Sequence, residues 1–141
     1  MCGFVGFTDL RPKEEKKIIV KSMADRIIHR GPDSDGYFTD DTVALGFRRL
    51  SIVDLAGGDQ PIFNEDKTKV IVFNGEIYNH KELRRELEKK GHIFSSNADT
   101  EAILHGYEEY GDALFNKLRG MFAFVIYDMR DNSLFGARDF F

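Results

Sequence analysis

Short apolar runs divide the chain into segments that are typical of β-strands. Residues 2–7 alternate small and large apolar side chains, as a buried strand does. Further strands are predicted at residues 43–47, 70–73, 121–127 and 133–138. The last two flank residues 128–132, so they should form a hairpin. The Gly and Pro content of residues 29–36 predicts a loop, and Asn74-Gly75 is expected to end the third strand.

Apolar positions at helical spacing predict three helices. The first covers residues 14–28, the second extends from an N-cap at Asn79 to Lys90 and stops at Gly91, and the third begins with Asp99 as its cap. The residues expected to face the core are Ile19, Met23 and Ile27 in the first helix, Leu83 and Leu87 in the second, and Ile103, Leu104 and Tyr107 in the third.

The order of these elements indicates one α+β domain over residues 1–141, with helices covering sheets. The chain is 42% hydrophobic, which is enough for a core, and no linker or repeat divides it. Its 20 basic and 24 acidic residues are intermixed and give a net charge of −4, which argues against nucleic-acid and membrane partners. No apolar run reaches the roughly 20 residues of a membrane span and no export signal is evident, so we expect a cytoplasmic protein.

Cysteine and histidine usage limits the possible cofactors. The single cysteine, Cys2, excludes an internal disulfide. The four histidines, His29, His80, His92 and His105, show none of the spacings typical of zinc ligands. The sequence therefore predicts no metal and no cofactor.

Cys2 is the first candidate for chemistry. Removal of Met1 would leave a thiol and a free α-amine on one residue, which is a nucleophile with its own base. The reference pKa of an α-amine, roughly 7.7–8, suits it to accept the thiol proton near neutrality, as in enzymes with an N-terminal threonine. The alternative is a small buried apolar residue. Position two of the chain favours the nucleophile.

Five polar or strand-end residues could complete a site around such a nucleophile. Asn74 and Gly75 could form an oxyanion hole, although Asn-Gly is also a common hairpin turn. Arg49 could grip a carboxylate bidentately, or could be a surface arginine. Glu76 and Asp99 could receive an ammonium group, or Glu76 could be solvated while Asp99 caps its helix. Taken jointly, the set fits a free amino acid that carries an acyl group, and glutamine matches that description.

Seven motifs in a fixed order support this interpretation. They are Met1-Cys2-Gly3, His29-Arg30-Gly31-Pro32-Asp33, Arg49-Leu50-Ser51-Ile52-Val53-Asp54, Asn74-Gly75-Glu76-Ile77-Tyr78-Asn79, Asp99-Thr100-Glu101, Leu118-Arg119-Gly120-Met121-Phe122-Ala123-Phe124 and Phe135-Gly136-Ala137-Arg138-Asp139. Together they resemble the glutaminase domain of the glutamine-hydrolysing asparagine synthetases, a branch of the class II amidotransferases. The resemblance runs from the first residue to the last.

The resemblance implies an N-terminal-nucleophile fold with two antiparallel sheets between helical layers, an αββα arrangement. Its roles transfer to matching residues. Cys2 would form a γ-glutamyl thioester and release ammonia, with Asn74 and Gly75 stabilising the oxyanion. Arg49 would bind the glutamine α-carboxylate, and Glu76 and Asp99 the α-amino group. The backbone around three residues would line the pocket: Leu50, Ile52 and Val53.

In the resembling family the ammonia passes to a second, synthetase domain that activates aspartate with ATP and magnesium. That domain and the last strands of the second sheet would follow Phe141, so ATP and magnesium are not expected to bind this chain. We expect weak activity from the chain alone and possible homo-oligomers, since a sheet edge would be open. Two alternatives are a folded but catalytically silent fragment, and an amidotransferase domain that serves a different acceptor.

Overall fold

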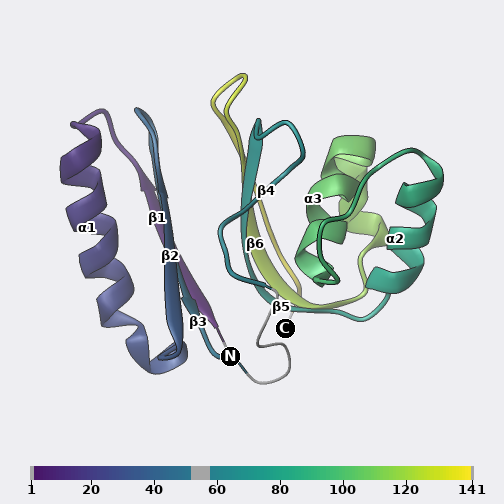
Figure 1. The fold of residues 1–141 in the computed structure, drawn as a ribbon, viewed down its shortest axis with the longest axis horizontal. Helices are drawn as coiled ribbons and strands as arrows, with labels where there is room; N and C mark the ends of the chain where they lie inside the picture. Colours follow the sequence, from purple (N-terminus) through teal and green to yellow (C-terminus); the bar gives the residue numbers. More distant parts are fainter. Residues whose placement is uncertain (1, 52–57, 141) are drawn as a thin grey trace. The chain divides into compact units, whose positions relative to one another are not determined.

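The computed structural model describes residues 2–51 and 58–140, and these form two compact units (Figure 1). The first unit comprises Met1–Pro61 with Val72–Asn74, and the second comprises Ile62–Ile71 with Gly75–Phe141. Each unit combines a β-sheet with α-helices.

The first unit is a three-stranded antiparallel sheet with a helix on one face (Figure 1). The sheet has the order β1-β3-β2. Its elements are β1 (Gly3–Thr8), α1 (Lys13–Arg26), the 3-10 helix η1 (Ile28–Arg30), β2 (Ser34–Thr39) and β3 (Val43–Arg49). Every residue of β3, the central strand of this sheet, is buried.

The buried face of α1 differs from the predicted one. Lys16, Val20 and Ala24 are buried there, whereas Ile19, Met23 and Ile27 are only half-buried. The Lys16 ammonium donates to two backbone carbonyls, those of Asp9 at 2.9 Å and Asp41 at 2.5 Å. An apolar pattern cannot predict this, because the lysine is buried by hydrogen bonding to loop backbone rather than by apolar contact.

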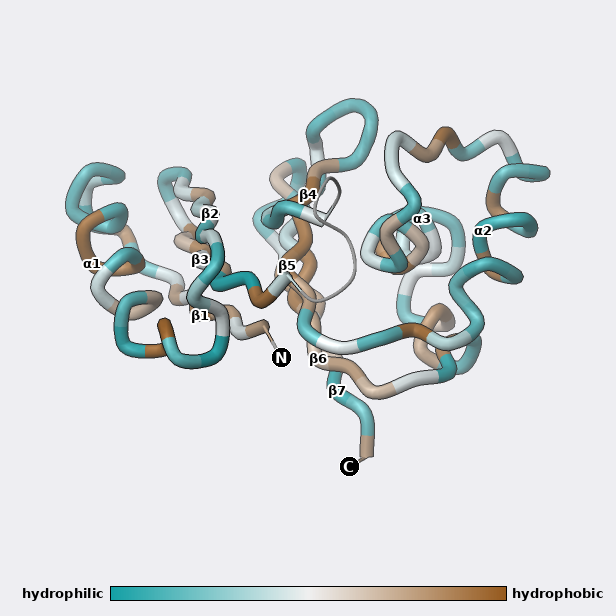
Figure 2. Tube along the Cα trace, turned by 60° about the horizontal axis from the view of Figure 1, so that its bottom comes forward, coloured by the Kyte–Doolittle hydropathy of each residue, from teal (hydrophilic) through white to brown (hydrophobic). Residues whose placement is uncertain are grey.

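The second unit is built around a four-stranded antiparallel sheet with the order β4-β5-β6-β7. Its elements are β4 (Ile62–Phe63), β5 (Lys69–Ile77), α2 (His80–Lys89), α3 (Asp99–Tyr110), the 3-10 helix η2 (Gly111–Lys117), β6 (Gly120–Asp128) and β7 (Ser133–Arg138). In Figure 2 much of β5 is hydrophobic whereas most of α2 is hydrophilic, as expected for a core strand and a surface helix. Tyr107 of α3 stacks on Phe135 of β7, with ring centroids 4.8 Å apart.

Most of the predicted elements are confirmed. The hairpin β6–β7 and the bounds of α2 agree with the sequence, and Leu83, Leu87, Ile103 and Leu104 are buried. Two strands were missed. β2 begins inside the predicted loop of residues 29–36, because pairing with β3 orders a polar, glycine-containing segment, and β4 has only two residues.

The two antiparallel sheets, each associated with helices, confirm the predicted mixture of antiparallel strands and helices. Among the described residues, none of the helices is both long and apolar enough to cross a bilayer.

Candidate active site

Cys2 lies immediately before β1, and its thiol contacts the backbone of Leu50. The Leu50 N–H donates to Sγ at 3.3 Å, and Sγ donates in turn to the Leu50 carbonyl oxygen at 3.8 Å. Antiparallel pairing of β1 with β3 sets this position, because Gly3 pairs with Arg48 and so brings the start of β1 to the end of β3. Cys2 is half-buried, which combines a fixed position with access for a substrate.

Arg49 is the last residue of β3 and is buried, so the alternative of a surface arginine is wrong. Its guanidinium Nη1 donates to Oδ1 of Asp59 at 2.8 Å. The Arg49 side chain is 11% exposed and that of Asp59 is 85% exposed, so a buried guanidinium holds a carboxylate that extends from the surface. The guanidinium is therefore able to bind a carboxylate, as predicted from its chemistry.

Residues of the segment before β2 contact Cys2 and the end of β3, although no role was predicted for them from the sequence. The Arg30 side chain donates to the carbonyl oxygen of Cys2 at 3.2 Å. The Asp33 N–H donates to the Arg49 carbonyl at 3.0 Å, and the Asp33 carboxylate accepts the Ser51 N–H at 2.6 Å. The available signal was the motif His29-Arg30-Gly31-Pro32-Asp33, which was one of the seven that carry the family resemblance.

Gly31 explains how this loop approaches β3 so closely. A Cβ atom on Gly31 would lie 2.4 Å from the carbonyl carbon of Arg48, which is far inside van der Waals contact. Only a glycine fits there without displacing the strand.

The prediction that Asn74-Gly75 ends a strand or forms a hairpin turn is wrong. β5 continues through both residues to Ile77. Gly75 has φ +145°, and a Cβ atom on it would lie 2.0 Å from the carbonyl oxygen of Met121. Gly75 is therefore needed for an unusual backbone angle and for the close approach of β6, and not for a turn.

Asn74 is positioned through the residue before it. Gln60 is buried and forms two hydrogen bonds with Phe73, donating from Nε2 to the carbonyl at 3.0 Å and accepting the N–H at Oε1 at 2.6 Å. A side-chain amide therefore takes the place of a neighbouring strand at this point. Asn74 itself is half-buried.

Glu76 and Asp99 both belong to the second unit, and Asp99 contacts the backbone of the residue after Glu76. Oδ2 of Asp99 accepts the N–H of Ile77, the residue after Glu76, at 2.9 Å. Asp99 is the first residue of α3, whose N-cap is Ala98, so its predicted role as the cap is wrong. Burial raises the pKa of Asp99, with the Ile77 hydrogen bond only partly opposing it. A bound cation would favour the charged carboxylate.

The predicted site residues fall into the two units. Cys2, Arg49, Leu50 and Asn74 belong to the first unit, and Gly75, Glu76 and Asp99 to the second. Ile52 and Val53, predicted to line the pocket, lie outside the described residues.

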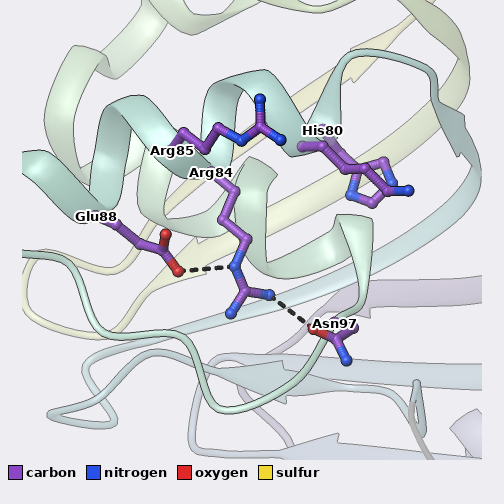
Figure 3. Close-up of a pocket in the computed structure, with 6 residues that line it drawn as sticks. His80, Arg84, Arg85, Glu88 and Asn97 are labelled. Carbon is purple, nitrogen blue, oxygen red and sulfur yellow. Dashed lines mark hydrogen bonds and ion pairs between the residues drawn. The ribbon is translucent and has the colours of Figure 1, made fainter.

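A separate basic pocket lies on α2, with a volume of about 460 Å³ (Figure 3). Its lining comprises His80, Lys81, Arg84, Arg85, Glu88 and Asn97. Arg84 is already engaged, donating to Glu88 Oε1 at 2.9 Å and to the Ser96 carbonyl at 2.6 Å. None of the predicted site residues lines this pocket, and Arg84 holds the chain after α2 through its hydrogen bond to Ser96.

Elsewhere in the second unit, donor atoms of Glu65, His92 and His105 lie within 4.8 Å of one another, the spacing needed to hold a metal ion. Sequence spacing gave no sign of this group.

Comparison with known proteins agrees with the chemistry of these residues. The family described as "Glutamine amidotransferase domain" matches residues 1–141. Asparagine synthetase [glutamine-hydrolyzing] 1 of Bacillus subtilis is 52% identical over 99% of this chain, which covers 22% of that protein. Asparagine synthetase [glutamine-hydrolyzing] 1 of Arabidopsis thaliana is 46% identical over 99% of the chain, or 24% of its own length. The chain therefore spans about a quarter or less of these curated relatives.

A solved structure supports the same fold. The glutamine phosphoribosylpyrophosphate amidotransferase from B. subtilis, complexed with ADP and GMP, aligns with a TM-score of 0.53 and 25% sequence identity. The alignment covers 64% of this chain and 22% of that one.

Proposed function

Because the chain belongs to the glutamine amidotransferase domain family over its whole length, we propose that it hydrolyses glutamine at Cys2 as part of a glutamine-hydrolysing asparagine synthetase. One observation carries the proposal. The only thiol of the chain, that of Cys2, contacts the backbone of Leu50. The residue before Leu50 is Arg49, which is buried. A nucleophile next to a carboxylate-binding residue is what hydrolysis of a free amino-acid amide requires.

The reaction proceeds in two steps. The α-amine of Cys2 takes the thiol proton, and the sulfur attacks the side-chain amide carbon of glutamine to form a tetrahedral oxyanion. The amide nitrogen takes the proton from the α-amine and leaves as ammonia, so a γ-glutamyl thioester remains. Water, deprotonated by the same amine, then attacks the thioester, releases glutamate and restores the thiol. We assign stabilisation of both oxyanions to the Asn74 side-chain amide and the Gly75 N–H.

The charged ends of glutamine are assigned to three side chains. Arg49 binds the α-carboxylate, and its contact with the Asp59 carboxylate supports this role. In this proposal the substrate replaces the exposed Asp59 side chain on the guanidinium. Glu76 and Asp99 bind the α-ammonium group, and the raised pKa of Asp99 returns towards its usual range when that cation arrives.

Leu50, Ile52 and Val53 are proposed to line the pocket with their backbone. For Leu50 this is supported by its hydrogen bonds to the Cys2 thiol. Asp33 acts here as a positioning residue, because it binds backbone groups on both sides of Leu50.

We propose aspartate as the final acceptor of the ammonia. Identity of 52% with an asparagine synthetase, against 25% with a phosphoribosylpyrophosphate amidotransferase, favours aspartate over another acceptor. Activation of aspartate with ATP and magnesium then belongs to a synthetase domain outside these residues. We further propose a cytoplasmic location, and self-association through exposed side chains such as Met121 and Leu134.

Release of glutamate from glutamine tests the proposal. The chain should release glutamate, and Cys2→Ser should abolish that release while leaving the circular dichroism spectrum and unfolding midpoint unchanged. His29→Asn, a change at an exposed histidine, is the matched control and should retain activity. A chain that unfolds cooperatively but releases no glutamate would instead be a silent fragment. Asparagine formation, measured with the full-length protein, aspartate and ATP, tests the acceptor separately.

A further inference from the structure

Four side chains from three segments of the second unit converge beside α3. Glu65 lies between β4 and β5, His92 lies between α2 and α3, and His105 and Glu108 lie one turn apart on α3. Nδ1 of His105 is 2.8 Å from Oε2 of Glu108 and 3.7 Å from Oε2 of Glu65. Nδ1 of His92 is 3.8 Å from the same Glu108 oxygen. Ligand atoms of Glu65, His92 and His105 all lie within 4.8 Å of one another, and the Glu108 carboxylate lies within 3.8 Å of both rings.

The outer nitrogens of both rings face further carboxylates. Nε2 of His92 contacts Oε2 of Glu109 at 3.0 Å, and Nε2 of His105 lies 4.0 Å from Oε1 of Glu101. Metal-binding histidines characteristically turn one nitrogen to the metal and give the other N–H to a carboxylate. The His92 ring already has this orientation, because its Nε2 hydrogen-bonds to Glu109, whereas Nε2 of His105 makes no hydrogen bond to Glu101.

His105 is the most deeply buried member of the cluster. Its side chain is 2% exposed, and Nε2 has no hydrogen-bond partner among the described residues. His92 is 16% exposed and Glu65 is 42% exposed, so the cluster is closed on the α3 side and open at Glu65. This provides an entry path for a small ion. Asn64 fixes the other Glu108 oxygen by donating to Oε1 at 2.6 Å.

We propose that Glu65, His92, His105 and Glu108 form a binding site for a divalent metal ion of the zinc class. Imidazole and carboxylate are both ligands of zinc, and four of them would complete its tetrahedral coordination. Bond lengths of about 2.0–2.2 Å imply ligand atoms about 3.3–3.6 Å apart in a tetrahedron. The separations of 2.8, 3.7 and 3.8 Å lie on both sides of that value, and the ligand atoms of Glu65, His92 and His105 lie within 4.8 Å of one another. Metal binding would replace the hydrogen bond between His105 Nδ1 and Glu108 and draw the side chains together.

The bound ion would act as a cross-link. It would join three parts of the second unit: the β4–β5 turn, the segment between α2 and α3, and α3 itself. His92 lies near the α2 end of that segment, whereas Asp99 lies at its α3 end. The site does not depend on the proposed glutaminase activity, because none of its four residues has a role there.

Cobalt(II) titration tests the site, with visible absorption as the readout. The titrations use the Cys2→Ser background, because a mature N-terminal cysteine would itself chelate metals through its thiol and amine. One equivalent of cobalt should bind and give the intense visible bands of a tetrahedral ion, and excess zinc should displace it. The thermal midpoint should rise with metal concentration, since the ion binds the folded state.

Two variants and a control identify the ligands without disturbing buried His105. His92→Asn and Glu65→Gln should each weaken cobalt binding by at least about tenfold and reduce the thermal shift. Glutamine at position 65 retains an acceptor for the Ile93 N–H, which Glu65 Oε1 accepts at 3.1 Å. His29→Asn in the first unit should bind as the parent does. The proposal is overturned by an absence of stoichiometric binding near pH 7, or by equal affinity in the parent and His92→Asn.

Discussion

Replacing Gly75 by alanine is expected to destabilise the chain strongly, through two separable effects. The first is backbone conformation, because φ is +145° at Gly75 and a residue with a Cβ rarely adopts that angle. The second is overlap with β6. The added Cβ would lie 2.0 Å from the Met121 carbonyl oxygen and 2.7 Å from Cα of Phe122.

These two effects set the expected magnitude. An unfavourable backbone angle costs about 1–3 kcal/mol. Backbone atoms cannot rotate out of an overlap as a side chain can, so β5 and β6 must separate by more than about 1 Å, with an overpacking cost of about 1–3 kcal/mol. The sum, about 2–6 kcal/mol, is a large part of a typical free energy of unfolding of about 5–15 kcal/mol. At roughly 4 °C per kcal/mol, the unfolding midpoint should fall by at least about 8 °C.

Two other glycines of the second unit separate the two effects. For all three variants, the free energy of unfolding is measured by urea unfolding followed by circular dichroism. Gly91 has φ +98° but no atom within 4 Å of an added Cβ, so Gly91→Ala should cost only the conformational part, about 1–3 kcal/mol. Gly136 has its nearest atom at 3.7 Å and no positive φ in the range that L-residues avoid. Gly136→Ala should be neutral or stabilising by up to about 1 kcal/mol.

The expected order of stability of the three variants tests the close approach of β6. Gly75→Ala should be the least stable, Gly91→Ala intermediate and Gly136→Ala nearest to the parent. If Gly75→Ala unfolded within about 0.5 kcal/mol of the parent, the close approach of β6 at this position would be refuted.

Three further changes have distinct signatures. Asn74→Ala should lower kcat far more than it raises KM, by about 2.7–4 kcal/mol of barrier, if Asn74 donates to the oxyanion; steady-state glutamate release separates the two parameters. Arg49→Lys should raise KM about tenfold or more, because lysine cannot form the bidentate pair, and an unchanged KM would remove Arg49 from the site. Glu101→Gln should reduce the loss of stability on acidification, measured by thermal unfolding between pH 7 and pH 3. The reason is that burial would raise the Glu101 pKa, but hydrogen bonds from Ser96 and Ser95 together hold it below its ordinary 4.5. A folded pKa below the unfolded one gives stability that is present above about pH 4.5 and lost as the pH falls further, so an equally steep acid loss in Glu101→Gln would contradict this assignment.

The fold was predictable where local pattern and packing agree. The hairpin β6–β7 and α2 follow directly from apolar spacing and from turn or stop residues. β2 was not predictable in this way, because Ser34, Asp35 and Gly36 are ordered by pairing with β3 rather than by their own propensity. Lys16 likewise is buried with its ammonium on the carbonyl oxygens of Asp9 and Asp41, and only the fold brings Asp41 to it.

For the candidate site, the chemical type of a residue predicted its possible role better than its place in the sequence predicted its contacts. The carboxylate-binding character of Arg49 follows from its guanidinium, whereas its burial depends on the register of β3. Asp99 resembled a helix cap in sequence, and only the fold brings its carboxylate to the N–H of Ile77. The cluster that includes His92 and His105 comes from separate segments, so no spacing rule could reveal it.

Intact-mass analysis after reaction with an electrophilic glutamine analogue tests the central claim most directly. The chain should lack Met1 and carry one adduct on Cys2, and glutamate release should stop in proportion to labelling. Excess glutamine should slow the reaction, whereas Cys2→Ser should neither react nor release glutamate. Full glutaminase activity in a chain that retains Met1 would contradict the use of the α-amine as base, and undiminished activity in Cys2→Ser would contradict the nucleophile itself.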